Sequence, residues 1–172
     1  MHWGCLKKGV TLMSRQREML AIAIGALCMG VLLYALDRQH DHVYFLSAWT
    51  PANSPTARVF GTLGNYLPTF IHVYAFILLT AAVAAPAMNK IIHICLAWFT
   101  LDCLFEVAQI DSSARWIAQH TPDWFSGVPF LENTGSYFLF GTFDVLDLLS
   151  IAAGTVAAYV TIRISSGKRV GS

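Results

Sequence analysis

Four long apolar segments constrain this chain more than any other feature of its sequence. They cover residues 19–36, 66–86, 91–110 and 145–162. A helix needs about 20 residues to cross the hydrocarbon core of a bilayer, and each segment reaches or approaches that length. Four fully buried helices of this length are not expected in a soluble chain of 172 residues. The sequence therefore predicts an all-α polytopic membrane protein, a bundle of four transmembrane helices with two long extracytoplasmic loops.

The composition agrees with a membrane as the solvent. Only 12% of the residues are charged, whereas an average soluble domain carries about 25%. No basic run is long enough to indicate nucleic-acid binding. The four cysteines lack the spacing of a metal site and are interpreted as small buried hydrophobes, so no metal and no cofactor is predicted. A weaker alternative is a metal site in the first outer loop, at His40 and His42 with Asp37 and Asp41.

Lysine and arginine are distributed unequally around the four segments, which predicts their orientation. Eight of them lie before the first segment, between the second and third, or after the fourth: Lys7, Lys8, Arg15, Arg17, Lys90, Arg163, Lys168 and Arg169. The other two loops hold only Arg38, Arg58 and Arg115. We therefore expect a multi-pass protein of the bacterial inner membrane with both termini in the cytoplasm. Residues 1–18 form the cytoplasmic N-terminal segment, 19–162 a single transmembrane domain, and 163–172 a cytoplasmic tail. Met13 offers an alternative start.

The two loops on the other side, residues 37–65 and 111–143, are rich in aromatic residues. Trp and Tyr favour the membrane interface, so these loops are expected to lie on the outer leaflet. Ser112 to His120 is predicted as a short interfacial helix, capped by Ser112 or Ser113 and ended by Pro122. Pro86 to Lys90 is predicted as a tight hairpin between the second and third segments.

Small residues at four-residue spacing predict close helix packing in two segments. They are Ala21 with Gly25, Ala26 with Gly30, and Ser150 with Gly154 and Ala158.

Polar residues within the segments are the strongest functional signal. Asp102, Glu106 and Gln109 share one face of the third segment because they are spaced four and three residues apart. Asp144 and Asp147 share a face where the fourth segment begins, and His72 lies near the beginning of the second. In the predicted orientation, all of these groups lie in the outer half of the membrane. We therefore expect them to form one acidic cluster.

An ionised carboxylate inside a membrane costs roughly 2.5 to 3.5 kcal/mol unless it is partnered, so such residues usually serve a function. Glu106 and Asp147 are predicted as catalytic groups, and His72, Asp102, Gln109 and Asp144 as ligand-binding groups. A pair between His72 and one carboxylate would suit acid–base chemistry or a proton relay. Three structural alternatives stay open: Asp144 as a helix cap, His72 as a packing residue, and the whole set as an interhelical hydrogen-bond network.

Three motifs resemble those of the VanZ-like family of small bacterial membrane proteins. They are Phe70-Ile71-His72-Val73-Tyr74-Ala75-Phe76, Phe105-Glu106-Val107-Ala108-Gln109, and Phe143-Asp144-Val145-Leu146-Asp147 followed by Gly154. Their order and spacing agree with the family over residues 60–162. The family often has an Arg just before the last motif, where this chain has Gly141 and Thr142, and an Asn where this chain has Ile151. The resemblance implies a four-helix envelope protein, in a family whose namesake is linked to glycopeptide (teicoplanin) resistance.

Three functions are compatible with these patterns. The first is an envelope factor whose outer-leaflet acidic pocket binds or acts on a lipid-linked or glycan ligand, with membrane lipid or a lipid-linked precursor as its partner. The second is a proton- or cation-handling transport component, which would require a homo-oligomer because four helices leave little room for a pathway. The third is a non-catalytic membrane assembly subunit. The predicted site has few cations, which argues against simple phosphate binding.

Overall fold

The computed structural model describes residues 3–37, 60, 61, 63–129 and 131–167, and every regular element among them is a helix. The elements, in order, are α1 (Trp3–Asp37), α2 (Leu63–Ala84), η2 (Met88–Lys90), α3 (Ile91–Val107), α4 (Asp111–His120), η3 (Asp123–Phe125), α5 (Thr134–Phe140) and α6 (Val145–Gly167). The all-α prediction is therefore confirmed for the described residues. Most of the first outer loop, including His40 and His42, lies outside them.

Three of these helices are long and apolar enough to cross a membrane. The spans are Met13–Leu33 within α1, Leu63–Ala84, and Val145–Ser166 within α6. Met88–Val107 and Asp111–His120 are long and apolar enough only when taken together, and they meet at a bend of 92°. The described residues thus hold three candidate spans, or four if the bent pair counts as one.

Two helices differ in extent from the apolar segments of the sequence. The third segment was expected to continue to residue 110, but α3 ends at Val107. There the amides of Gln109 and Ile110 bond to carbonyls three residues back, and Ile110 is extended. The first helix begins at Trp3 and not at residue 19, because lysine, arginine, glutamine and glutamate favour a helix as much as most apolar residues do.

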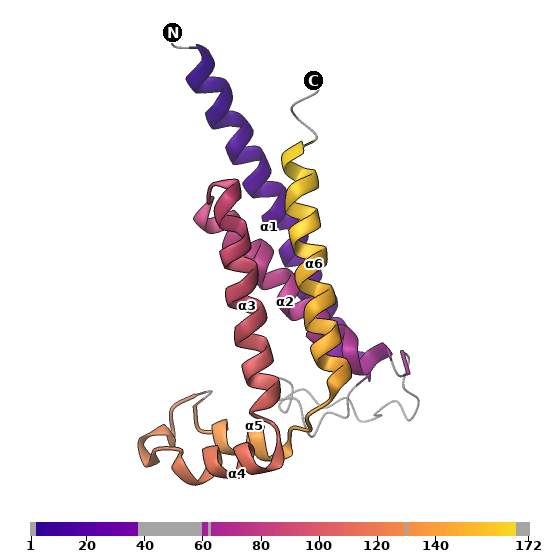
Figure 1. The fold of residues 1–172 in the computed structure, drawn as a ribbon, viewed down its shortest axis with the longest axis vertical. Coiled ribbons are helices and arrows are strands. Elements are labelled where there is room, and N and C mark those ends of the chain that lie inside the picture. The colour runs from indigo at the N-terminus through magenta and orange to yellow at the C-terminus, as the bar shows by residue number, and fades with distance from the viewer. Residues whose placement is uncertain (1–2, 38–59, 62, 130, 168–172) are drawn as a thin grey trace.

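The bundle is organised around α2, which packs against α1, α3 and α6. Its core contains Val73, Ile77 and Leu78 of α2 with Ile151, Ala158 and Ile162 of α6 and Met19 and Ala23 of α1. Both termini lie at one end of the bundle, together with the turn between α2 and α3 (Figure 1). We call this the terminal end.

The predicted hairpin between the second and third segments is present. The amide of Ala85 still donates to the carbonyl of Ala81. Ala85 itself has a positive φ of 44°, and this backbone conformation ends α2. Pro86 follows and prevents the helix from continuing. The chain then turns through η2 into α3, so α2 and α3 run in opposite directions.

The small-residue prediction is confirmed for α6 and in part for α1. Gly154 and Ala158 are buried, and a Cβ at Gly154 would lie only 2.7 Å from the carbonyl oxygen of Phe70 on α2. Gly30 of α1 is also buried, against Ile71. Gly25, in contrast, is exposed and has no neighbour within 4 Å of an added Cβ.

At the end opposite the termini, α4, η3 and α5 (residues 111–140) form a layer across the bundle axis, which we call the platform (Figure 1). Phe138 of α5 is buried and stacks on Phe105 of α3. The predicted helix over Ser112 to His120 is present as α4, but its predicted cap is wrong. The N-cap is Ile110, with no side-chain cap bond, because α4 begins at Asp111 and includes both serines. Exposed Trp116, Trp124 and Tyr137 give the platform an aromatic surface.

Candidate functional site

Glu106 joins α3 to the segment that leads into α6. It is only 7% exposed, and its Oε1 accepts a 2.8 Å hydrogen bond from the backbone N–H of Asp144. Asp144 directly precedes α6, so its N–H has no partner within that helix. Glu106, in the last turn of α3, therefore fixes the position at which the chain enters α6.

Asp144 uses its two carboxylate oxygens in different ways. Its Oδ1 accepts a 2.9 Å bond from the backbone N–H of Leu146, which caps the N-terminus of α6. Its Oδ2 accepts a 3.0 Å bond from the hydroxyl of Tyr66 on α2. The cap, one of the alternatives indicated by the sequence, is thus present, and the same residue also joins α6 to α2.

Asp147 forms a second link between α6 and α2. Its Oδ1 accepts a 2.7 Å hydrogen bond from the hydroxyl of Thr69. Glu106 binds the amide of Asp144, and Asp147 lies one turn further along the chain in α6, so the three carboxylates are neighbours. We call Glu106, Asp144 and Asp147 the carboxylate frame, because they join α2, α3 and α6 at the platform end of the bundle.

Loss of the Thr69 hydroxyl should weaken this end of the bundle slightly. Interhelical hydrogen bonds in membrane proteins contribute about 0.6 kcal/mol on average. Thr69→Val should lower the free energy of unfolding in detergent by about that amount, measured by titration with sodium dodecyl sulfate. Thr155→Val is the matched control, since the Thr155 hydroxyl bonds within its own helix to the carbonyl of Ile151. An equal loss in both variants would contradict a specific role for the Thr69 bond.

His72 and Asp102 form a pair apart from the frame. His72 Nδ1 lies 3.3 Å from Asp102 Oδ2, with the His72 side chain 51% exposed and the Asp102 side chain 10% exposed. An ionised carboxylate only accepts hydrogen bonds, so it favours the tautomer with the proton on Nδ1 and leaves Nε2 as an acceptor. The His72 ring also contacts Phe76, at 4.5 Å between centroids, and lies 6.5 Å from Trp98. The predicted pairing of His72 with a carboxylate is confirmed.

Gln109 lies beyond the last turn of α3, against the segment between α5 and α6. A Cβ added to Gly141 would overlap its amide group. Asp102, Glu106 and Gln109 were expected to face one site because they share a helix face. Instead, each faces a different neighbour: His72 of α2, the Asp144 amide, and Gly141. Their predicted catalytic and ligand-binding roles stay predictions.

The chain matches no protein-family model, no curated protein and no solved structure. The site is therefore interpreted from its own geometry. Among the described residues, no group of three or more His, Cys, Asp or Glu side chains is placed to hold a metal ion. The alternative metal site at His40 and His42 lies outside the described residues.

Two residues of the site were missed from the sequence, Tyr66 and Thr69. Both donate to the frame from the first two turns of α2. A signal was present, because Tyr66, Thr69 and His72 recur at three-residue spacing and so form a polar stripe along α2. Hydroxyl groups are common in membrane helices, which is why this stripe is easily overlooked.

Proposed function

We propose that this chain is a VanZ-like envelope protein of the bacterial inner membrane that acts on a lipid-linked or glycan ligand at the outer leaflet. In this proposal the chain crosses the membrane four times, with α3 as the third span and both termini in the cytoplasm. The platform then lies on the outer leaflet, directly above the carboxylate frame. The unequal distribution of lysine and arginine and the order of the three motifs support it.

The observation that carries the proposal is the pair between His72 and Asp102. A carboxylate on Nδ1 orients the ring, and Nε2 is left to exchange a proton with a ligand. The ring is half exposed, whereas Glu106 is buried and holds a backbone amide. Of these two groups, His72 is the better placed to touch a ligand. We therefore assign proton transfer to His72, with Asp102 as the positioning residue.

The surroundings of His72 favour a ligand that arrives from within the bilayer. The ring lies on a membrane helix beside the apolar rings of Phe76 and Trp98. A side chain exposed at this depth faces lipid and not bulk water. A ligand with a lipid tail reaches such a position by lateral diffusion, and its polar head would lie near the platform.

The shortage of cations argues that the ligand is not held through its phosphate by this site. Gly141 and Thr142 occupy the positions at which the family often has an arginine. The Gln109 amide fills the space beside Gly141, so a side chain there would displace it. Neutral hydrogen bonds, as a sugar or peptide group offers, suit Gln109 and His72 better than an anion does.

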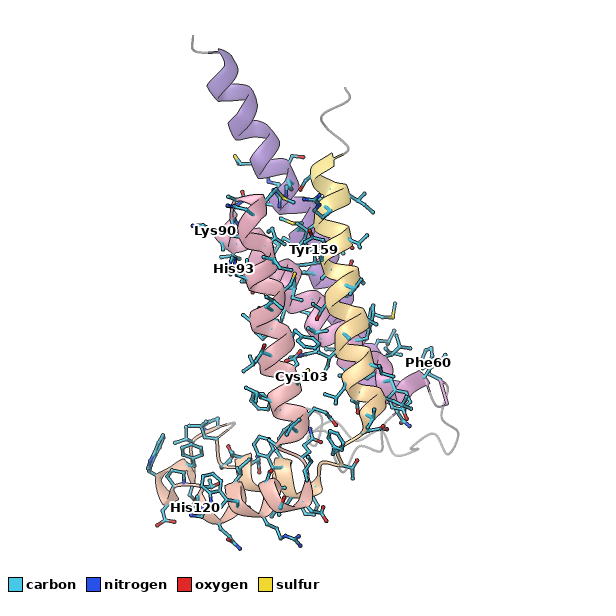
Figure 2. The ribbon with its side chains drawn as sticks, in the orientation of Figure 1. Phe60, Lys90, His93, Cys103, His120 and Tyr159 are labelled. Atoms are coloured by element: carbon cyan, nitrogen blue, oxygen red, sulfur yellow. The ribbon has the colours of Figure 1, made fainter. Side chains whose placement is uncertain are left out.

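The test is complementation of a strain that lacks the gene, measured as its susceptibility to teicoplanin. His72→Asn removes the titrating ring but keeps an amide near the Nδ1 position, and it should lower resistance to the level of the deletion strain. His93→Asn is the matched control, because His93 is exposed on α3 near the terminal end (Figure 2). Membrane levels of both variants should equal that of the wild type. Full complementation by His72→Asn would overturn the assignment of proton transfer.

A second candidate function is a non-catalytic membrane assembly subunit. The observation that favours it is the use of all three frame carboxylates as hydrogen-bond acceptors that join helices. A subunit of this kind would tolerate His72→Asn and would co-purify with a membrane partner. The complementation test therefore separates the two candidates, since only the first predicts loss of function in a folded variant.

A further inference from the structure

A hollow lies between α1 and α2 at the terminal end, at the opposite end of the bundle from the carboxylate frame. Its volume is about 150 Å³, and it is lined by Met13, Gln16, Arg17, Leu20, Ala82 and Val83. A cavity of about this size holds one small group, such as a benzene ring. The lining contains one cation and no acidic residue. Glu18 follows Arg17 in the chain but does not line the hollow.

On α1 the polar lining residues Gln16 and Arg17 lie between the apolar residues Met13 and Leu20. Gln16 Nε2 donates a 3.0 Å hydrogen bond to the carbonyl of Ala82. Arg17, which is exposed, is the charged residue of the lining. Leu20 lies one turn of α1 further into the bundle, and it is exposed, as is Val83 of α2. A charged group beside exposed apolar side chains, at the edge of a candidate span that begins at Met13, matches the boundary between lipid head groups and acyl chains.

Further cations lie at the terminal end, where they outnumber Glu18 of α1. Lys90 lies in the turn between α2 and α3 (Figure 2), and Arg163 lies in the last turns of α6. Arg15, which lies on α1 between the lining residues Met13 and Gln16, has a buried Nε atom without a hydrogen-bond partner among the described residues. An excess of positive charge next to a membrane attracts anionic lipids, and basic pockets between membrane helices bind their head groups.

We propose that the hollow between α1 and α2 binds the head group of an anionic phospholipid of the phosphatidylglycerol type, from the leaflet at the terminal end. Arg17 contacts the phosphate, Leu20 contacts the beginning of an acyl chain, and Val83, next to the carbonyl that binds Gln16, lies beside the head group. The lipid thereby fills the groove between the two helices where they leave the membrane. This site is separate from the proposed outer-leaflet function and does not depend on it.

The experiment is native mass spectrometry of the full chain in detergent with dioleoyl-phosphatidylglycerol, dioleoyl-phosphatidylcholine or inorganic phosphate. The wild type should retain one phosphatidylglycerol in preference to phosphatidylcholine. Arg17→Gln should weaken the binding of phosphatidylglycerol about fivefold, as expected for one cation near a lipid surface. Arg163→Gln is the matched control, because it removes the same charge from an exposed position on α6 outside the hollow. It should leave binding within about twofold of the wild type.

Val83→Phe provides a second variant that keeps every charge. Because Val83 is 75% exposed, the larger ring should not disturb the core, but it should occupy the hollow and reduce phosphatidylglycerol binding. The proposal is overturned by equal losses in Arg17→Gln and Arg163→Gln, which would indicate diffuse attraction, or by unchanged binding in Val83→Phe. Equal binding of the two lipids also overturns it, as does displacement of the lipid by millimolar phosphate. If Arg17→Gln does not fold, Val83→Phe alone decides.

Discussion

Gly154→Ala should lower the free energy of unfolding by about 1 to 3 kcal/mol, and Gly154→Leu should prevent the bundle from assembling. The added Cβ would lie 2.5 Å from Val73 Cγ1 and 2.7 Å from the carbonyl oxygen of Phe70. The valine methyl group could rotate away, but the Phe70 carbonyl is fixed within the hydrogen-bonded backbone of α2. The α2–α6 interface must therefore open, and the cost of opening exceeds the helix propensity gained by replacing glycine.

Gly25→Ala is the control for this prediction. Gly25 has nothing within 4 Å of an added Cβ. Only the higher helix propensity of alanine therefore acts, and the variant should be more stable by up to about 1 kcal/mol. Both variants are measured by titration with sodium dodecyl sulfate, followed by tryptophan fluorescence. If Gly154→Ala unfolds at the same detergent fraction as the wild type, the close approach of α2 and α6 is wrong.

The Gly154 variants also test how packing supports the site. Thr69 precedes Phe70 in α2, and its hydroxyl donates to Asp147 of α6 across the same interface. A wider interface would stretch this bond and the bond between Tyr66 and Asp144. Gly154→Ala should therefore weaken complementation even if the protein still reaches the membrane.

Hydrophobicity and turn chemistry were sufficient to predict the long helices, the Pro86 hairpin and the short helix α4, but not α5. They were not sufficient to predict where α3 ends. The apolar run continues to Ile110, and no glycine or proline lies between Val107 and Asp111. Tertiary contacts, such as those of Gln109 with Gly141, accompany the bend there. A position determined by tertiary contacts leaves no local signal in the sequence.

The carboxylates show the same limit. Helical spacing placed Asp102 and Glu106 on one face, and that placement was the basis for expecting one cluster. The spacing does not say which neighbouring helix or segment packs against that face at Asp102 and which packs against it at Glu106. Asp102 meets His72 of α2, whereas Glu106, one turn later, meets the segment before α6. The acidic residues therefore belong to two groups with different environments. The His72 side chain of the first is half exposed, whereas the Glu106 side chain of the second is buried.

Glu106→Ala should be among the most destabilising substitutions at the platform end. It would remove the acceptor for the Asp144 N–H and leave a void at a position that is only 7% exposed. A lost hydrogen bond to a charged group, with a buried donor left unpaired, costs about 2 to 3 kcal/mol. Glu106→Gln should stay within about 1 kcal/mol of the wild type, since its amide oxygen still accepts the bond. Titration with sodium dodecyl sulfate measures both.

The same pair of variants separates a framing role of Glu106 from a catalytic one. Glu106→Gln keeps the acceptor but abolishes the carboxylate. With His72 as the group that transfers the proton, Glu106→Gln should fold and complement the deletion strain, whereas Glu106→Ala should fail at the level of folded protein. A Glu106→Gln variant that reaches the membrane in wild-type amounts but leaves the strain susceptible to teicoplanin would favour the catalytic role predicted from the sequence. Asp102→Asn should lose function in either case, because an asparagine amide can also donate to Nδ1 and so no longer fixes the ring tautomer that leaves Nε2 as an acceptor.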